Sequence, residues 1–367
     1  MGMWLAILVL VLGAVGAGIF YMISAVGKFS LVEKASKGKS WLRRLISFGI
    51  IAVGFVLFGL IFSAVNAIII FLHLILFWLI YGLILRIVKR ISGRSPKINL
   101  QGWLAIASCA VYLSVGYYLC VNVWVTHYDL KTKKQTGSIR AVLFADSHIG
   151  ATWSSDGFAE HMEDINNEHP DIVLIAGDFV DDGTNKDDMI KACEALGKLD
   201  TKYGVYYCFG NHDKGYYGSQ RGFSAQELGD NLEKNGVHIL EDEYEMIDDR
   251  ICIVGRADKS DEDRKPIDKL LEGVDDDKYI IVMDHQPGDY DAESKSAADL
   301  VVSGHTHGGQ LFPMTHFGLF MSVNDRTYGY ERRNGTDFLV TSGISDWELK
   351  FKTGTKSEYV VIDIEQE

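Results

Sequence analysis

The sequence predicts an all-α membrane region of four transmembrane helices followed by an α/β domain. Charge separates the two parts: residues 1–125 carry eleven Lys and Arg and one acidic residue, Glu33, a formal charge of +10, whereas the remainder carries −23. Long apolar runs fill the first part, and short runs of β-branched and aromatic residues alternate with helical patterns in the second. The long runs are typical of membrane spans and the short runs of buried strands.

Four apolar stretches within residues 1–126 predict the membrane-spanning helices. About 20 apolar residues, at ~1.5 Å per residue, cross a hydrocarbon core of ~30 Å. The first stretch has no charged residue, and no basic segment precedes it as in a cleaved signal peptide. Residues 45–88 are apolar for about twice the length of one span, so we expect two helices with a turn near Ser63–Asn66. The expected spans are about 3–26, 45–64, 66–88 and 103–125.

The basic residues of this region lie in the loop after the first span and in the loop after the third span together with its flank, on one side of the membrane. Eleven Lys and Arg gather there, against Lys131, Lys133 and Lys134 after the fourth span. Because short basic loops stay in the cytoplasm, this distribution places the following domain outside the cytoplasm. The orientation reverses if residues 45–88 form one re-entrant element instead of two spans.

The second part is expected to comprise a linker, residues 127–138, and an α/β domain, residues 139–367. Strands are expected at 141–145, 171–176, 204–209, 251–255, 279–283 and 299–303. Helices are expected at 155–168, 187–199 and 224–235, the last beginning with the capping box SAQE and ending at Gly236. Two final runs, 337–344 and 358–365, are expected to close the sheet system as an antiparallel, hairpin-like pair.

Polar clusters follow the ends of five expected strands. They are DSH (146–148), GDFVDD (177–182), GNHD (210–213), DHQP (284–287) and SGHTH (303–307). Ligands collect at this edge of α/β sheets, and imidazoles, carboxylates and an amide oxygen suit first-row divalent cations, two of which one carboxylate can bridge. Positions i and i+2 of an extended strand end point alike, so Asp-x-His and His-x-His should each present two donors on one face. Flanking Gly304, Gly308 and Gly309 permit turns and close approach. The pattern predicts a two-metal centre.

This ordered series resembles the calcineurin-like metallophosphoesterase superfamily, whose signature is D-x-H, G-D-x-x-D, G-N-H-D/E, a later His and G-H-x-H. The GHTHGGQ ending, with Pro313 soon after it and SGI later, resembles the membrane-associated bacterial branch typified by YkuE-type phosphoesterases. The resemblance covers residues 139–367 and implies a four-layer α/β/β/α sandwich that holds two divalent ions, Mn, Fe or Zn. It implies Asp146, His148 and His307 as ligands of the first metal, Asn211, His285 and His305 as ligands of the second, and Asp178 as the bridge.

The resemblance also implies a catalytic pair that does not bind metal. His212 would contact the phosphoryl group or protonate the leaving oxygen, and Asp181 would orient it. A carboxylate beside an imidazole favours the protonated ring, which suits a general acid. The alternative is that both residues only position the site. Further candidates for the lining of the substrate pocket are Gln310, Arg326, Tyr328, Asp346 and Trp347.

The sequence thus predicts a multi-pass membrane protein whose extracytoplasmic domain hydrolyses a phosphate ester or anhydride. About ten linker residues of ~3.3 Å each cannot carry the site far from the bilayer, so we expect a phosphorylated small molecule or lipid of the cell envelope as substrate. Nucleic acid is excluded as a partner, because its binding needs basic surfaces and this domain carries a formal charge of −23. Two alternatives stay open: a cytoplasm-facing nucleotide or nucleotide-sugar pyrophosphatase, and a membrane sensor or transporter whose phosphoesterase-like domain is not catalytic.

Overall fold

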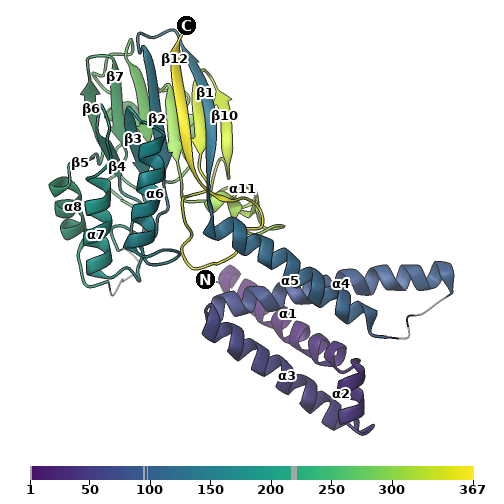
Figure 1. Ribbon diagram of the computed structural model, residues 1–367. Helices are drawn as coiled ribbons and strands as arrows, with labels where there is room; N and C mark the ends of the chain where they lie inside the picture. Colours follow the sequence, from purple (N-terminus) through teal and green to yellow (C-terminus); the bar gives the residue numbers. More distant parts are fainter. Residues whose placement is uncertain (1, 94–95, 97, 216–220) are drawn as a thin grey trace. The chain divides into compact units, whose positions relative to one another are not determined.

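The computed structural model describes residues 2–93, 96, 98–215 and 221–367. The chain forms two compact units, Met1–Val115 and Gly116–Glu367, which Figure 1 shows as a group of helices and a sheet-containing body. The second unit begins inside the helix that precedes the first strand, so the last turns of this helix belong to the same compact unit as the sheets.

The first unit is built from apolar helices. They are α1 (Gly2–Val26), α2 (Ser30–Ala35), α3 (Ser40–Ile61), α4 (Ala64–Ser92) and the first part of α5 (Leu100–Val121). Among the described residues, α3, α4 and α5 are long and apolar enough to cross a membrane. The expected span 3–26 is helical, but most of its side chains before Val15 lie outside the described set, and the described apolar part, Val15–Val26, is shorter than a span. The predicted turn is confirmed: Ser63 Oγ accepts from Asn66 N at 3.2 Å and caps α4.

The second unit contains two six-stranded sheets. Its strands are β1 (Val123–Thr132), β2 (Ser138–Phe144), β3 (Ile172–Ala176), β4 (Val205–Cys208), β5 (Val237–Ile239), β6 (Glu243–Ile247), β7 (Ile251–Gly255), β8 (Tyr279–Met283), β9 (Leu300–Ser303), β10 (Gly329–Arg333), β11 (Thr336–Val340) and β12 (Ser357–Gln366). Its further helices are α6 (Ser155–Asn167), α7 (Lys186–Leu196), α8 (Ala225–Lys234), α9 (Ile267–Leu270), α10 (Tyr290–Glu293), α11 (Phe317–Phe320) and the 3-10 helix η1 (His307–Gly309). The strand orders are β1-β12-β2-β3-β4-β5 and β10-β11-β9-β8-β7-β6. The six expected strands and three expected helices are confirmed, and β1, β5, β6 and β10 are additional.

The sheets face each other and carry helices on their outer faces, which is the four-layer α/β/β/α order. Along β2, Val142 and Phe144 pack in the outer core with α6, α7 and α8, whereas Ala141 and Leu143 pack in the core between the sheets. The outer face of the second sheet packs on α9 and α10. Because side chains alternate along a strand, a strand covered on both faces has a continuous apolar sequence. The core strands are therefore readable in the sequence.

The stretch expected to be a linker, 127–138, is largely a strand. β1 pairs in parallel with β12 over its whole length, and only Asn122 separates it from α5. The apolar start of β1, Val123–Val125, continues the apolar pattern of the preceding helix, so the sequence does not mark where that helix ends. The chain therefore enters the first sheet directly from the end of α5.

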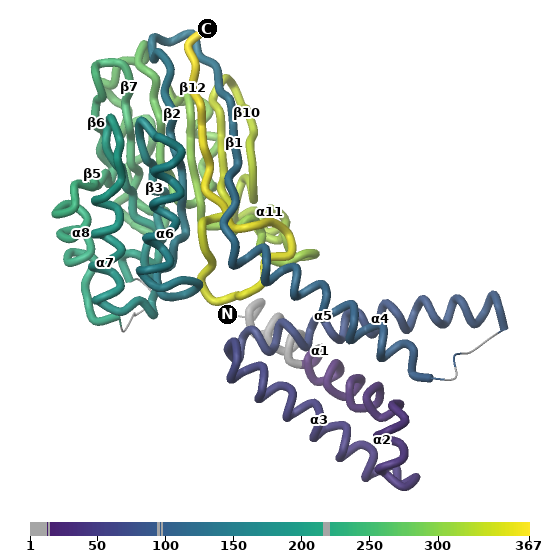
Figure 2. Tube along the Cα trace, in the orientation of Figure 1, coloured from purple at the N-terminus to yellow at the C-terminus, as the bar shows by residue number. Residues whose placement is uncertain are grey.

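The two final strands do not form the expected antiparallel pair. β11 belongs to the second sheet, where it is antiparallel to β10 and parallel to β9. β12 belongs to the first sheet, between β1 and β2. Both runs are apolar and close in sequence. Which strands each run pairs with depends on the sheet that it packs in. Figure 2 shows β12 running to the C-terminus at the end of the unit away from α11.

A buried ion cluster holds the strand end that precedes His285. Arg256 Nη1 lies 3.0 Å from Asp284 Oδ2 and 2.9 Å from Glu293 Oε1, and all three side chains are at most 2% exposed. Arg264 contributes a second cation at Asp284 Oδ2. Since removal of one member leaves the opposite charges buried and uncompensated, the cluster should be important for stability.

We therefore expect Arg256→Met, which keeps the volume and removes the charge, to lower the free energy of unfolding by ~3–5 kcal/mol. The matched control is Lys269→Met, because Lys269 forms an ion pair with Glu272 in which the two side chains are 64% and 72% exposed. An exposed pair contributes at most about 1 kcal/mol. Thermal unfolding of the full chain in detergent measures both variants, and equal midpoints would contradict a stabilising role for the cluster.

Candidate metal centre

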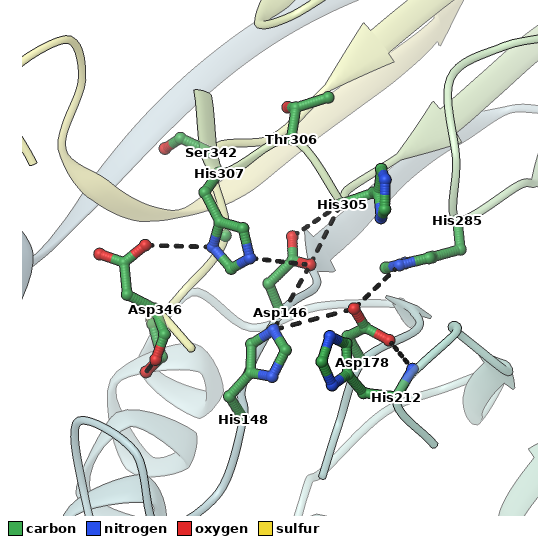
Figure 3. A network of polar contacts seen from close by, with 12 residues as sticks. Asp146, His148, Asp178, His212, His285, His305, Thr306, His307, Ser342 and Asp346 are labelled. Atoms are coloured by element: carbon green, nitrogen blue, oxygen red, sulfur yellow. Dashed lines mark hydrogen bonds and ion pairs between the residues drawn. The ribbon is translucent and has the colours of Figure 1, made fainter. Parts of the chain in front are cut away.

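The five predicted clusters meet where the carboxyl ends of strands from both sheets come together. β2, β3 and β4 are parallel in the first sheet, and β7, β8 and β9 are parallel in the second. Two hydrogen bonds join loops across this edge: His285 Nδ1 donates to Ala176 O at 2.7 Å, and His305 N donates to Asp146 Oδ2 at 2.9 Å. Figure 3 shows the resulting group of side chains.

One set of donors consists of Asp146, His148 and His307, whose donor atoms lie within 4.8 Å of one another. Asp146 Oδ1 is 4.0 Å from His148 Nε2 and 3.8 Å from His307 Nε2. The two imidazoles stack with ring centroids 5.2 Å apart. Two imidazole nitrogens and one carboxylate therefore face a common point, as the first predicted ligand set requires.

A second set consists of Asp178, His285 and His305, again with donor atoms within 4.8 Å of one another. His285 Nε2 lies 3.1 Å from Asp178 Oδ2 and 3.2 Å from Asn211 Oδ1, so the amide oxygen predicted for this set is present as well. Burial and the neighbouring His285 lower the pKa of His305 to about 3, which keeps its imidazole neutral and able to bind a cation.

Asp178 lies between the two sets. Its Oδ2 is 3.1 Å from His285 Nε2 and 3.8 Å from His148 Nε2, and its Oδ1 accepts from His212 N at 2.8 Å. The same carboxylate therefore faces one imidazole of each set, in the position of the predicted bridge (Figure 3). The structure thus brings together all seven residues predicted as ligands; their binding of metal remains a proposal.

The donor set fits divalent cations. The buried His148 has no hydrogen bond at Nε2 among the described residues, although the two carboxylates lie 3.8–4.0 Å from that atom. Two ligands each about 2.1 Å from one cation are separated by roughly 3–4 Å, which is the spacing found here. Burial disfavours charge on His285, but the carboxylates of Asp178 and Asp146 outweigh burial and raise its pKa. A cation bound at the same atoms would take the place of that proton.

The backbone that presents these donors differs from the extended strand ends that the sequence predicts. The Asp-x-His and His-x-His motifs lie in the loops after their strands. The backbone angle φ is positive at five donor residues: Asp146 (56°), His148 (40°), Asp178 (52°), His305 (69°) and His307 (47°). Side chains in this left-handed conformation do not alternate as in a strand, so the i, i+2 explanation is wrong although the side chains do converge. Each such residue costs about 1–3 kcal/mol, and such strain is concentrated at functional sites.

Glycines give the loops the required room and conformations. Gly308 (φ 60°) and Gly309 (φ 71°) have positive φ, as expected for the HTHGG turn. Gly304 permits close approach instead, because a Cβ there would lie 2.7 Å from Asp146 Oδ2. Gly210 lies against Asp178, with whose carboxylate and backbone nitrogen a Cβ would collide.

His212 and Asp181 lie beside the first donor set. His212 Nδ1 is 3.2 Å from Asp181 Oδ1 and 3.6 Å from Asp182 Oδ2. Burial lowers the pKa of His212, but the contact with Asp181 and the charges of Asp178 and Asp182 outweigh burial and raise it to about 9. Asp181 Oδ1 is also 3.5 Å from His148 Nδ1, so one carboxylate orients the predicted acid and a predicted ligand. The role of the pair in catalysis remains a proposal.

Asp346 supports His307 from the side away from the donor set, a function that the sequence did not reveal. Its Oδ1 lies 3.1 Å from His307 Nδ1, which leaves Nε2 facing Asp146. Its Oδ2 accepts from Cys120 Sγ at 3.1 Å, and Lys352 Nζ lies 3.5 Å from Oδ1. A carboxylate on the second nitrogen of a ligand histidine fixes the ring orientation. The spacing of SGISDWE carries no signal for this contact, so Asp346 was only one of several candidates.

Asp213, the last residue of GNHD, fixes the loop that carries Asp178. Its carboxylate accepts from the backbone nitrogens of Asp178 (2.8 Å), Val180 (3.0 Å) and Gly210 (2.7 Å). Of the suggested pocket residues, Trp347 lies near the site, with its ring centroid 6.5 Å from that of His212. Other suggested residues have partners elsewhere: Arg326 pairs with Glu331, Tyr328 OH donates to Glu358, and Gln310 Nε2 donates to Leu349 O.

The close packing of Gly210 against Asp178 can be tested with a pair of glycine-to-alanine variants. We expect Gly210→Ala to displace Asp178 and to weaken binding of Mn²⁺ by about 10- to 100-fold, the usual effect of disturbing groups that support a metal ligand. Gly183→Ala is the control, since a Cβ there meets no atom within 4 Å. Calorimetric titration of the apo proteins measures both, and wild-type affinity in Gly210→Ala would show that the position of Asp178 does not determine binding.

Comparisons with known proteins find relatives of the part of the chain that carries the donor sets. A family model described as calcineurin-like phosphoesterase matches residues 139–309. An uncharacterised metallophosphoesterase of Aquifex aeolicus is 32% identical over 248 residues, covering 65% of this chain and 91% of that protein. One of Campylobacter jejuni is 27% identical over 290 residues, covering 77% and 71%.

A transmembrane protein with metallophosphoesterase domain from Danio rerio is 29% identical over 251 residues, covering 64% of this chain. The match spans 55% of the length of that fish protein. Because the Aquifex relative is matched over nearly its whole length, its similarity is not confined to a short motif. The chain belongs to the calcineurin-like metallophosphoesterase family.

Proposed function

We propose that the protein is a membrane-anchored phosphoesterase that binds two divalent cations and hydrolyses a phosphate ester or anhydride of a lipid-linked or other cell-envelope substrate. The observation that carries the proposal is the position of Asp178, whose Oδ2 faces imidazoles of both donor sets. Asp146, His148 and His307 would hold one cation, and Asn211, His285 and His305 the other. When bound, the cations supply a water of lowered pKa and positive charge that neutralises phosphoryl oxygens.

The protein's own residues have separable tasks in this proposal. Asp346 and Asp213 keep ligand loops in place, so the donors are positioned before substrate binds. His212 keeps its Nδ1 toward Asp181, which leaves Nε2 to carry the proton for the leaving oxygen. Trp347, 43% exposed and near His212, offers an apolar surface beside the site.

The membrane part of the proposal rests on the helices and on their connection to the catalytic unit. α3, α4 and α5 have the length and composition of spans, and their basic loops favour an extracytoplasmic catalytic unit. Only Asn122 lies between the end of α5 and the start of β1. A site on a unit attached so directly favours substrates that are themselves in or near the bilayer. The GHTHGGQ, Pro313 and SGI motifs favour the YkuE-type branch.

Asp178→Asn tests the two-cation proposal. We expect the initial rate of aryl phosphate ester hydrolysis with added Mn²⁺ to fall by about 100-fold or more, because the variant loses the charge that faces both sets. Asp276→Asn, in an exposed loop, is the matched control and should keep wild-type activity. Unchanged hydrolysis by Asp178→Asn would exclude the proposed chemistry. A panel of aryl monoester, aryl diester and lipid phosphates then identifies the substrate class.

Asp181→Asn separates acid catalysis from positioning by His212. The contact with Asp181 helps to raise the pKa of His212, so its removal lowers that pKa and His212 loses its proton at lower pH. We therefore expect the alkaline limb of the pH profile of kcat/KM to move to lower pH in Asp181→Asn. The exposed Asp187→Asn is the control. A limb that stays in place while the rate falls would favour a purely positioning role.

A further inference from the structure

The second unit carries an exposed apolar segment immediately after the HTHGG turn. Residues 311–323, LFPMTHFGLFMSV, contain no Asp, Glu, Lys or Arg, although residues 126–367 carry a charge of −23. Among the described residues of Gly116–Glu367, fourteen large hydrophobic side chains are exposed, and seven of them lie in this segment, which we term the apolar lip. They are Phe312, Met314, Phe317, Leu319, Phe320, Met321 and Val323. Such a concentration marks an interaction surface.

The apolar lip is anchored beside the metal centre at both ends. It follows His307 by four residues, and Thr306 Oγ1 donates to Thr327 O at 2.6 Å across its base. Beyond its far end, Asp325 N donates to Pro287 O at 2.7 Å, two residues after His285. The lip is therefore a fixed projection of the loops that carry one predicted ligand of each donor set.

Several backbone N–H groups of the lip donate to carbonyl groups within the lip. Phe317 N donates to Met314 O at 2.9 Å, and in α11 Phe320 N donates to His316 O at 3.0 Å and Met321 N to Phe317 O at 3.0 Å. Internal hydrogen bonding of this kind is what a segment needs to enter a lipid environment, where water cannot replace the missing partners. Phe320 projects most, with 84% of its surface exposed.

Hydrogen bonds connect the lip to the end of α5. Phe312 N donates to Thr353 Oγ1 at 3.0 Å, and Thr353 N donates to Gln310 O at 2.8 Å. The neighbouring Lys352 N donates to Gly116 O of α5 at 2.9 Å. All of these residues belong to the unit Gly116–Glu367. Figure 1 accordingly shows α11 at the end of this unit where β1 starts.

The end of α5 and the start of β1 carry aromatic residues that are typical of a membrane interface. Tyr117, Tyr118 and Trp124 are 42%, 54% and 38% exposed. Lys356 Nζ lies 5.7 Å from the centre of the Trp124 ring. Tyr and Trp concentrate where membrane helices leave the hydrocarbon core. The apolar lip is thus hydrogen-bonded, through Thr353 and the neighbouring Lys352, to a segment that has the composition of the lipid–water boundary.

We propose that the apolar lip inserts into the interfacial layer of the bilayer that α5 enters, and so holds the metal centre against lipid headgroups. The lip has no charged side chain whose desolvation would oppose insertion, while its aromatic and Met side chains gain by leaving water. The inference rests on the membrane placement of α5 in the proposed function. It does not require that the site be active.

Probe depth tests the inference directly. Spin labels are attached to Phe320→Cys, to Asp276→Cys as the aqueous reference, and to the 66% exposed Val111→Cys of α5 as the membrane reference. The five native cysteines are buried and should label poorly. The full chain is reconstituted in phosphatidylcholine vesicles, and collisions of each label with oxygen and with a water-soluble nickel chelate are compared. We expect the oxygen-to-nickel ratio at position 320 to approach that at 111 and to exceed clearly that at 276.

Each other outcome overturns a stated part of the inference. If the oxygen-to-nickel ratio at 320 equals that at 276 while 111 is protected from the nickel chelate, the lip is not inserted, although α5 is in the membrane. An oxygen-to-nickel ratio at position 111 that equals the ratio at 276 contradicts the membrane placement of α5, and with it the inference. Protection of 320 that disappears at high lipid-to-protein ratio indicates that a second copy of the chain, instead of lipid, covers the lip.

A substrate comparison checks the consequence for catalysis. Phe320→Asp should lower hydrolysis of vesicle-embedded phosphatidic acid relative to a water-soluble aryl phosphate by about tenfold or more, the factor expected when one buried aromatic contact is lost. The matched control is Met246→Asp, an exposed apolar side chain on β6, which should keep the wild-type ratio, and unfolding midpoints check that both variants fold. An unchanged ratio in Phe320→Asp contradicts the inference. If the unmodified chain hydrolyses neither substrate, the proposed function fails while probe depth still decides the inference.

Discussion

The structure depends on keeping two carboxylates, Asp146 and Asp178, among five imidazoles in a buried space. Asp146 is 0% and Asp178 2% exposed, and their side chains face the same ring nitrogen of His148. Buried like charges are unfavourable unless a positive charge compensates them, which divalent cations do. The loops that impose this arrangement are strained at five donor residues, so their conformation must be enforced by the two sheets whose strand ends carry them.

The conformation of these loops is held by groups that do not themselves face the donor sets. Asp213 accepts hydrogen bonds from three backbone nitrogens around Asp178, and Arg256 forms an ion pair with Asp284, the residue before His285. Asp346 orients His307 while accepting from Cys120 at the end of α5. The carboxylate of Asp346 therefore connects the end of α5 to a predicted ligand. In the proposed function, anchoring and catalysis would therefore share structural elements of the second unit, where α5 leads directly into β1.

The sequence predicts those features that are local or buried on both faces. The core strands were readable as continuous apolar runs, the Ser224–Glu227 capping box predicted the start of α8, and the donors gathered as expected because each follows a strand end. Partner choice was not readable: β11 and β12 are similar apolar runs that join different sheets. The positive φ values and the contact of Asp346 were also missed, because backbone handedness and contacts between distant loops leave no mark in residue spacing.

The most direct test of the account is anomalous diffraction from crystals of the full chain grown with Mn²⁺. We expect two manganese peaks about 3.5–4 Å apart. One should be bounded by Asp146, His148 and His307, the other by Asn211, His285 and His305, with Asp178 between them. A single peak, or peaks that these side chains do not contact, would contradict the two-cation centre on which the proposed function depends.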